Sequence, residues 1–226
     1  MISAAAFDID GTLTFRDRSL ELNAIRAIRR LRIPVILATG NVFCSVHAIA
    51  VAIGGISGVI AENGGIVTDN RARIISGNIE ACRIAARAVE RSNKFNLKRL
   101  DVAERVTEVA YSRDTLTDAD VTSFRKIVME CCRDVTVVDS SFALHIRDIN
   151  VNKGVGLTKI AELLGIPLSK FAAFGDSEND VEMLKVAGRG VAVANADTQA
   201  KAAADYITNK DHGLGVIEGL KYLKLL

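Results

Sequence analysis

The sequence predicts an α/β fold in which a mostly parallel sheet, covered by helices on both faces, is interrupted by a small α+β insert. Three observations support this. Apolar runs alternate with helical segments in the first third of the chain, and the same alternation returns in the last third. The middle third instead shows two helical segments among strands of alternating polarity. Near-continuous apolar strands separated by helices are typical of a parallel sheet buried on both faces.

In the first third, strands are predicted over residues 4–9, 33–38 and 59–61, and helices over residues 19–32 and 42–53. Apolar residues recur at helical spacing in both helical segments, and the second one stops at Gly54-Gly55. The Asn63-Gly64 pair then predicts a hairpin into a further strand at residues 66–67, because Asn-Gly favours tight turns.

The insert is expected over residues 76–150, between core segments at residues 1–75 and 151–226. Its predicted helices are residues 79–91 and 118–132, and its strands are residues 106–111, 135–138 and 142–146. The last third is predicted to hold strands at residues 171–174 and 190–193 and helices at residues 154–164, 178–187, 198–204 and 215–225. The whole pattern indicates a Rossmann-like doubly wound core with a small inserted domain.

Bulk composition excludes several classes of protein. With a formal net charge of +2 and 49% hydrophobic residues, the 226-residue chain has no electrostatic signature of nucleic-acid or membrane binding. Its four cysteines include no Cys-x-x-Cys pair, which favours reduced thiols, and the first residues lack the basic start of a signal peptide. A cytoplasmic protein is therefore expected, and the choice between monomer and homodimer stays open.

Polar residues follow each predicted core strand. These are Asp8 and Asp10, Thr39 and Gly40, Glu62 and Asn63, the run from Asp176 to Asp180, and Asn195, while Lys153 lies just before the helix that re-enters the core. Because the carboxyl ends of parallel strands meet at one edge of a sheet, these side chains are expected to lie together. Residues two apart also share one side of a strand, so both Asp8 and Asp10 are expected to reach one ligand.

Four carboxylates at close range repel one another and raise one another's pKa, and a divalent cation would relieve that repulsion. An all-oxygen ligand set of Asp8, Asp10, Asp176 and Asp180 points to Mg²⁺. A metal and a lysine facing a carboxylate nucleophile form a site for phosphoryl transfer through an aspartyl phosphate. Thr39 and the backbone N–H groups near Gly11 and Gly40 are expected to bind phosphate oxygens.

The same residues resemble the motifs of haloacid dehalogenase superfamily phosphatases. Asp8-Ile9-Asp10-Gly11-Thr12-Leu13 is similar to the first motif, Thr39 to the second, Lys153 to the third and Gly175-Asp176-x-x-Asn179-Asp180 to the fourth.

This resemblance implies a nucleophilic Asp8 and an acid–base role for Asp10. It also implies phosphate binding by Thr39 and Lys153. The metal would bind Asp8, the Asp10 backbone carbonyl and Asp176, with Asp180 as a direct or supporting ligand. Asn179 and Asn63 are expected to support the site from behind, although an Asn in a loop more often forms a turn.

The insert lies between the second and third motifs, as in the relatives that carry an α/β cap. The small insert resembles the short caps of the archaeal phosphoglycolate phosphatases. A cap of this size suits a small phosphorylated metabolite, and 2-phosphoglycolate is the first candidate substrate. A sugar-phosphate phosphatase or a phosphomutase of the same superfamily is the alternative, and a phospho-accepting signalling receiver is a third reading. His145 and Arg147, just before the return to the core, are candidates for substrate contact.

Overall fold

The computed structural model describes residues 1–69, 71–140 and 142–226. Within them the chain forms two compact units, a core made of Met1–Ile74 with Asn152–Leu226, and a cap made of Ile75–Val151. The core holds an eight-stranded sheet and the cap holds a separate four-stranded sheet. The predicted fold class, a mainly parallel α/β core with an α+β cap, is confirmed.

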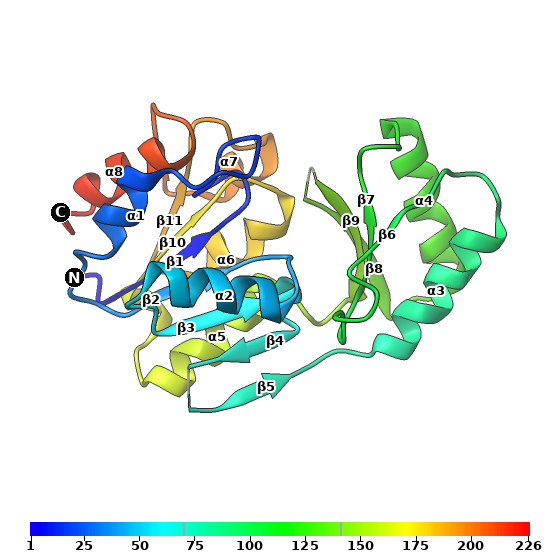
Figure 1. Cartoon of the computed structure of the whole chain (residues 1–226), viewed down its shortest axis with the longest axis horizontal. Coiled ribbons are helices and arrows are strands. Elements are labelled where there is room, and N and C mark those ends of the chain that lie inside the picture. Colours follow the sequence, from blue (N-terminus) through cyan, green and yellow to red (C-terminus); the bar gives the residue numbers. More distant parts are fainter. Residues whose placement is uncertain (70, 141) are drawn as a thin grey trace. The chain divides into compact units, whose positions relative to one another are not determined.

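The core sheet is parallel through its centre. Its strands are β1 (Ala4–Asp8), β2 (Val35–Ala38), β3 (Gly58–Ala61), β4 (Ile66–Thr68), β5 (Arg73–Ile75), β10 (Phe171–Gly175), β11 (Arg189–Ala192) and β12 (Tyr206–Ile207). They lie in the order β12-β11-β10-β1-β2-β3-β4-β5, and Figure 1 labels the strands from β11 to β5. β3 pairs with β4 antiparallel, as the Asn-Gly hairpin signal predicts. β1 lies between β10 and β2, so the two ends of the chain supply adjacent central strands.

Two groups of helices cover the core sheet. The helices are α1 (Leu22–Ile28), α2 (Phe43–Ile53), α5 (Lys153–Leu164), α6 (Val181–Val186), α7 (Thr198–Ala203) and α8 (His212–Tyr222). α1 packs against α8, whereas α5, α6 and α7 pack in a row. The two groups cover opposite faces of the sheet. Phe174 lies against Gly219 of α8, and Ile60 lies against Gly156 of α5. The strand registers place Phe174 and Ile60 on opposite faces.

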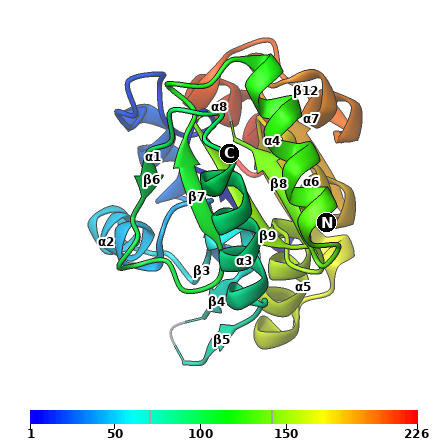
Figure 2. The same cartoon turned by 90° about the vertical axis from the view of Figure 1, so that its right-hand side faces the viewer.

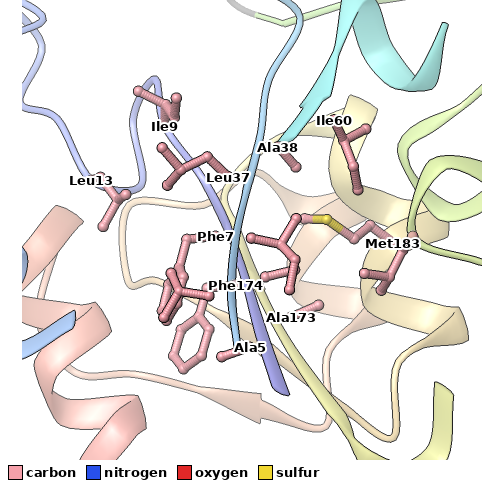
Figure 3. Close-up of a cluster of buried hydrophobic side chains, with 14 of the residues drawn as sticks. Ala5, Phe7, Ile9, Leu13, Leu37, Ala38, Ile60, Ala173, Phe174 and Met183 are labelled. Carbon is pink, nitrogen blue, oxygen red and sulfur yellow. The ribbon is translucent and has the colours of Figure 1, made fainter. Parts of the chain in front are cut away.

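Aromatic and aliphatic side chains fill the core on both faces of the central strands. Phe7 and Phe174 come from neighbouring strands and stack with ring centroids 4.8 Å apart. Both rings are fully buried, and Figure 3 shows them beside Ala5. Burying aromatic rings of this size contributes strongly to stability. This packing fixes β1 against β10, the two strands whose ends carry the acidic motifs.

The cap is a four-stranded antiparallel sheet with two helices. Its elements are α3 (Ile79–Arg91), β6 (Arg99–Leu100), β7 (Val109–Ser112), α4 (Asp118–Cys131), β8 (Val135–Asp139) and β9 (Ala143–Asp148), with strand order β6-β7-β9-β8. Figure 2 shows α3 and α4 side by side, and both pack on this sheet. Alternate residues such as Tyr111, Leu144 and Ile146 form an apolar face that is buried with Phe124 of α4.

Several predicted boundaries shift in the structure. The helix expected over residues 19–32 is shorter, because Leu20 pairs with Thr14 in an isolated bridge and Glu21 caps α1 at its start. The helix expected over residues 178–187 begins as a 3-10 turn at Glu178–Asp180 and continues as α6. β5, β6 and β12 were not predicted, since strands of two or three residues carry little periodicity.

None of the helices in the described ranges is both long and apolar enough to cross a bilayer. All four cysteines are free thiols in the described structure, and of these Cys82 is buried.

Candidate active site

The acidic motifs meet at the carboxyl edge of the core sheet. β1 ends at Asp8 and its neighbour β10 ends at Gly175, directly before Asp176. Carboxylate oxygens of Asp8, Asp176 and Asp180 all lie within 4.8 Å of one another. Three of the four predicted acidic ligands are thus clustered.

Lys153 lies in the middle of this cluster. Its Nζ donates to Asp8 Oδ1 at 2.6 Å and to Asp180 Oδ1 at 2.7 Å. Lys153 is the first residue of α5, which Asn152 caps by accepting the Val155 N–H, and its side chain is fully buried. Because Asp8 points to the sheet face that α5 covers, the lysine reaches it from the start of that helix.

Asp180 connects the lysine to the loop after β10. Its Oδ1 accepts from Lys153, and its Oδ2 accepts the backbone N–H groups of Asp176 and Ser177 at 3.0 and 3.2 Å. Gly175 permits this close approach, because a Cβ there would lie 2.5 Å from Asp180 Cβ. Asp180 therefore holds both Lys153 and Asp176 in place.

Asp176 is held from the first motif. Thr12 Oγ1 donates to Asp176 Oδ1 at 2.8 Å. Gly11 adopts φ +91°, and a Cβ at this position would lie 2.3 Å from Asp176 Oδ2. The glycine is thus required both for the turn after β1 and for the approach of the carboxylate. Thr12 was not predicted as a site residue, since its position in the motif gives no sign of its partner.

Burial and mutual repulsion perturb the acids strongly. Burial and the charge of Asp180 raise the pKa of Asp8 well above its ordinary value, against the opposing effect of Lys153. Burial and Asp180 likewise raise the pKa of Asp176 to about 7. Burial alone would lower the pKa of Lys153, but Asp180 and Asp8 raise it, so the lysine stays charged. Lys153 supplies a single positive charge among the three acids Asp8, Asp176 and Asp180, so negative charge remains to be neutralised.

The donor set fits a hard divalent cation. Asp8 Oδ2 is buried and has no hydrogen-bond partner among the residues that the structure describes. Buried carboxylate oxygens are normally hydrogen-bonded or bound to a ligand, so this atom is available to a ligand of the site. Oxygen atoms of Asp8 and Asp176, with a third acid behind them, match the preference of Mg²⁺.

Asp10 has partners of its own. β1 ends at Asp8, so strand alternation does not extend to Asp10, and its carboxylate is not one of the clustered groups. Arg18 Nε donates to Asp10 Oδ1 at 3.0 Å, and Asn41 Nδ2 donates to Asp10 Oδ2 at 2.6 Å. Neither Arg18 nor Asn41 was predicted as a site residue. Asn41 could have been, because it directly follows Thr39 and Gly40 at the end of the second predicted strand.

The second motif forms the turn between β2 and α2. Thr39 is fully buried, its N–H donates to the Ile60 carbonyl, and its Oγ1 accepts the Asn41 N–H at 3.0 Å. Gly40 lies in the same turn, two residues before Val42, the N-cap of α2, which has no side-chain cap hydrogen bond. In the turn after β1 the Gly11 N–H itself donates to Thr14 Oγ1, and phosphate binding by the N–H groups near Gly11 and Gly40 stays a prediction.

The predicted supporting asparagines contact each other. Asn179 Nδ2 donates to Asn63 Oδ1 at 3.0 Å, and Ser177 Oγ donates to Asn179 Oδ1 at 2.7 Å. Asn63 is also a turn residue, with φ +52°. The pair joins the loop after β3 to the loop after β10.

Asn195 holds the first motif from the other side. Its Nδ2 donates to the Gly11 carbonyl at 3.0 Å, and its Oδ1 accepts the His212 N–H.

The two cap candidates are buried within the cap. His145 Nδ1 lies 2.8 Å from Glu108 Oε1, and Arg147 donates to the Val151 carbonyl. Both side chains are therefore parts of the cap's own polar network.

An α/β core whose edge joins a buried carboxylate, a shared lysine and two further acids defines a phosphoryl-transfer enzyme with an inserted cap. A model of haloacid dehalogenase-like hydrolases matches residues 5–98 and 81–220, and the chain belongs to this family. It is a phosphatase of that family, which confirms the resemblance given by the four motifs.

Similar proteins extend along the whole chain. A phosphoglycolate phosphatase of Methanococcoides burtonii is 44% identical over 98% of this chain and 96% of its own length. A phosphoglycolate phosphatase of Archaeoglobus fulgidus is 45% identical over 99% of this chain and 97% of its own length. Among solved structures, a Thermoplasma acidophilum protein superposes with a TM-score of 0.87 at 28% identity, covering all of both chains.

Proposed function

We propose that this phosphatase is a Mg²⁺-dependent hydrolase of 2-phosphoglycolate, which it converts to glycolate and phosphate. One observation carries the chemistry: Lys153 binds one oxygen of Asp8 and leaves the other, Oδ2, buried without a partner in the described structure. A carboxylate held by one oxygen presents the other as a nucleophile. The substrate is proposed from the names of relatives that match the full length of the chain.

The proposed reaction has two steps. Asp8 Oδ2 attacks phosphorus, the bond from phosphorus to the substrate oxygen breaks, and Asp10 donates a proton to the departing oxygen. In the second step Asp10 takes a proton from a water molecule that attacks the aspartyl phosphate, which restores Asp8 and releases phosphate. Thr39, Gly40 and Lys153 hold the phosphoryl oxygens during both steps.

Asp8, Asp176 and the Asp10 backbone carbonyl are the proposed ligands of Mg²⁺, which supplies positive charge against the phosphoryl oxygens when bound. The structure favours a positioning role for Asp180, because its oxygens already accept from Lys153 and from two backbone N–H groups. Asn179 and Asn63 support the same loop through their mutual hydrogen bond.

Three alternatives can be distinguished from this proposal, two of them within the superfamily. A sugar-phosphate phosphatase would share every core residue and differ in substrate preference. A phosphomutase would retain the phosphoryl group for return to product, and a signalling receiver would keep a long-lived phosphoaspartate. The acid–base candidate Asp10 favours hydrolysis over the receiver reaction, because it can activate water against the intermediate. A phosphomutase would share Asp10, and net phosphate release without a bisphosphate activator would exclude it.

The test is phosphate release from a panel that holds 2-phosphoglycolate, sugar phosphates and a simple alkyl phosphate, with Mg²⁺ and with EDTA. We expect metal-dependent release with 2-phosphoglycolate ahead. Asp8→Asn should abolish release while thermal unfolding shows an intact fold. A preference for sugar phosphates would overturn the substrate assignment, and unchanged activity of Asp8→Asn would overturn the nucleophile.

A further inference from the structure

Beside Asp10 the core carries a cation that the catalytic steps above do not use. Arg18 lies in the loop between the paired residues Thr14 and Leu20, and its side chain is 55% exposed. Its Nε donates to Asp10 Oδ1 at 3.0 Å, and its Nη2 donates to Asn41 Oδ1 at 3.3 Å. Asn41 in turn donates to Asp10 Oδ2, so the three side chains form a closed ring of hydrogen bonds.

The backbone at Arg18 is unfavourable for an arginine. Its N–H donates to the Phe15 carbonyl, the Phe15 N–H donates to the Ser19 carbonyl, and Arg18 itself has φ +66°. A turn position in the left-handed region favours Gly, Asn or Asp, and other residues cost free energy there. Backbone strain of this kind is characteristic of functional positions. It therefore suggests a functional role for the Arg18 guanidinium.

We infer that Arg18, supported by Asn41, binds the carboxylate of the substrate, so that the enzyme selects phosphomonoesters with a carboxylate on the carbon next to the ester oxygen. This inference rests on the proposed function and deepens it. All of its residues belong to the core, so the carboxylate is recognised on the same loops that carry out the chemistry.

The geometry follows from the role of Asp10. A general acid must lie within about 3 Å of the oxygen that it protonates. In 2-phosphoglycolate that oxygen is separated from the carboxylate carbon by one methylene, that is, by two bonds of about 1.5 Å each. Since the Arg18 guanidinium contacts Asp10 directly, a leaving oxygen on Asp10 brings the substrate carboxylate within reach of Arg18. A guanidinium has five N–H donors in a planar fork and can bind several acceptors together.

The experiment compares kcat/KM for 2-phosphoglycolate with kcat/KM for 2-hydroxyethyl phosphate, a probe of similar length without the carboxylate. The readout is the ratio of the two values. In Arg18→Gly we expect this ratio to fall about 10- to 100-fold, the loss typical of a charge-assisted hydrogen bond. Most of the loss should be a higher KM for 2-phosphoglycolate. Arg18→Lys, which keeps the charge without the fork, should give an intermediate ratio.

Two controls separate binding from folding and from charge. Arg18→Gly should unfold at the same or a higher temperature, because glycine relieves the left-handed backbone. Arg16→Gly removes the same charge from an exposed neighbour in the same loop, and it should leave the ratio unchanged.

An equal loss for both substrates in Arg18→Gly would show that Arg18 only positions Asp10, and it would overturn the inference while the proposed function stands. Wild-type enzyme that does not hydrolyse 2-phosphoglycolate would overturn the proposed function itself.

Discussion

Asp176, a proposed ligand of Mg²⁺, is expected to lower the stability of the folded protein when no metal is bound. Its pKa is raised to about 7 by burial and by Asp180, so at neutral pH its charge is unfavourable in the folded core. We expect Asp176→Asn to raise the free energy of unfolding by about 1–3 kcal/mol in EDTA, since one pKa unit corresponds to about 1.4 kcal/mol. The amide oxygen can still accept from Thr12, so the loop should keep its shape.

The same variant should lose Mg²⁺-dependent phosphate release. Thermal unfolding in EDTA and activity in Mg²⁺ are the two measurements. Asp134→Asn, the same change at an exposed position of the cap, is the matched control and should alter neither. An Asp176→Asn protein that is less stable than wild type would contradict the electrostatic argument.

At the scale of single residues, the sequence predicts the groups whose chemistry is unusual and misses those whose role depends on a turn. Acids and a lysine at strand ends are informative because buried charge needs a reason, and Asp8, Lys153, Asp176 and Asp180 do meet. Arg18 carried no such signal. Its contact with Asp10 depends on the loop conformation, which composition does not reveal.

At the scale of elements, long segments are predictable and short ones are not. α3 was predicted with its observed bounds, because thirteen residues contain several helical periods. The end of β1 at Asp8 was less predictable, and it matters more. The expectation that Asp8 and Asp10 share one side assumed a strand through both residues, whereas the turn after Asp8 gives the second acid different partners.

The close packing of α5 on β3 can be tested by substituting Gly156. Gly156 lies against Ile60, and a Cβ there would lie 2.7 Å from Ile60 Cγ2 and 3.1 Å from Gly64 Cα. Gly156→Ala should therefore displace α5 and with it Lys153 at its first turn. We expect a loss of about 1–3 kcal/mol in stability, as for other overpacked cores, and a lower kcat.

Urea unfolding and steady-state kinetics measure these two effects. Glu162→Ala, at an exposed position of the same helix, is the control and should leave both nearly unchanged. A stable Gly156→Ala enzyme with unaltered kcat would show that α5 can shift without moving the lysine.

At the scale of the whole molecule, the site exists only when both ends of the core chain are folded together. Lys153 and Asp8 are 145 residues apart in sequence, and Thr12 and Asp176 are 164 apart. Closing such long loops costs conformational entropy, which the packing of β1 between β10 and β2 must offset. The sequence showed this return to the core through the repeated strand–helix alternation, but not the hydrogen bonds that connect the two halves.

The clustered acids also predict how global stability depends on pH. The carboxyl of Asp176 has an ordinary pKa of 3.8 in the unfolded chain and a pKa of about 7 in the folded core, and Asp8 is shifted in the same direction. Between these values the folded protein binds more protons than the unfolded chain, so its free energy of unfolding contains a term that falls as pH rises from about 4 to about 7. This term is largest without metal.

The contribution of Asp176 to this pH dependence can be isolated by comparing wild type with Asp176→Asn. The stability of wild type minus that of Asp176→Asn, measured in EDTA by urea unfolding, should decrease as pH rises from 4 to 7. Saturating Mg²⁺ should reverse the trend for wild type, because the ion binds the ionised carboxylates and competes with protons, so its affinity rises with pH. A difference that is flat over this range would mean that the acids are ionised in the folded protein without a cation, with Lys153 alone sufficient to neutralise them.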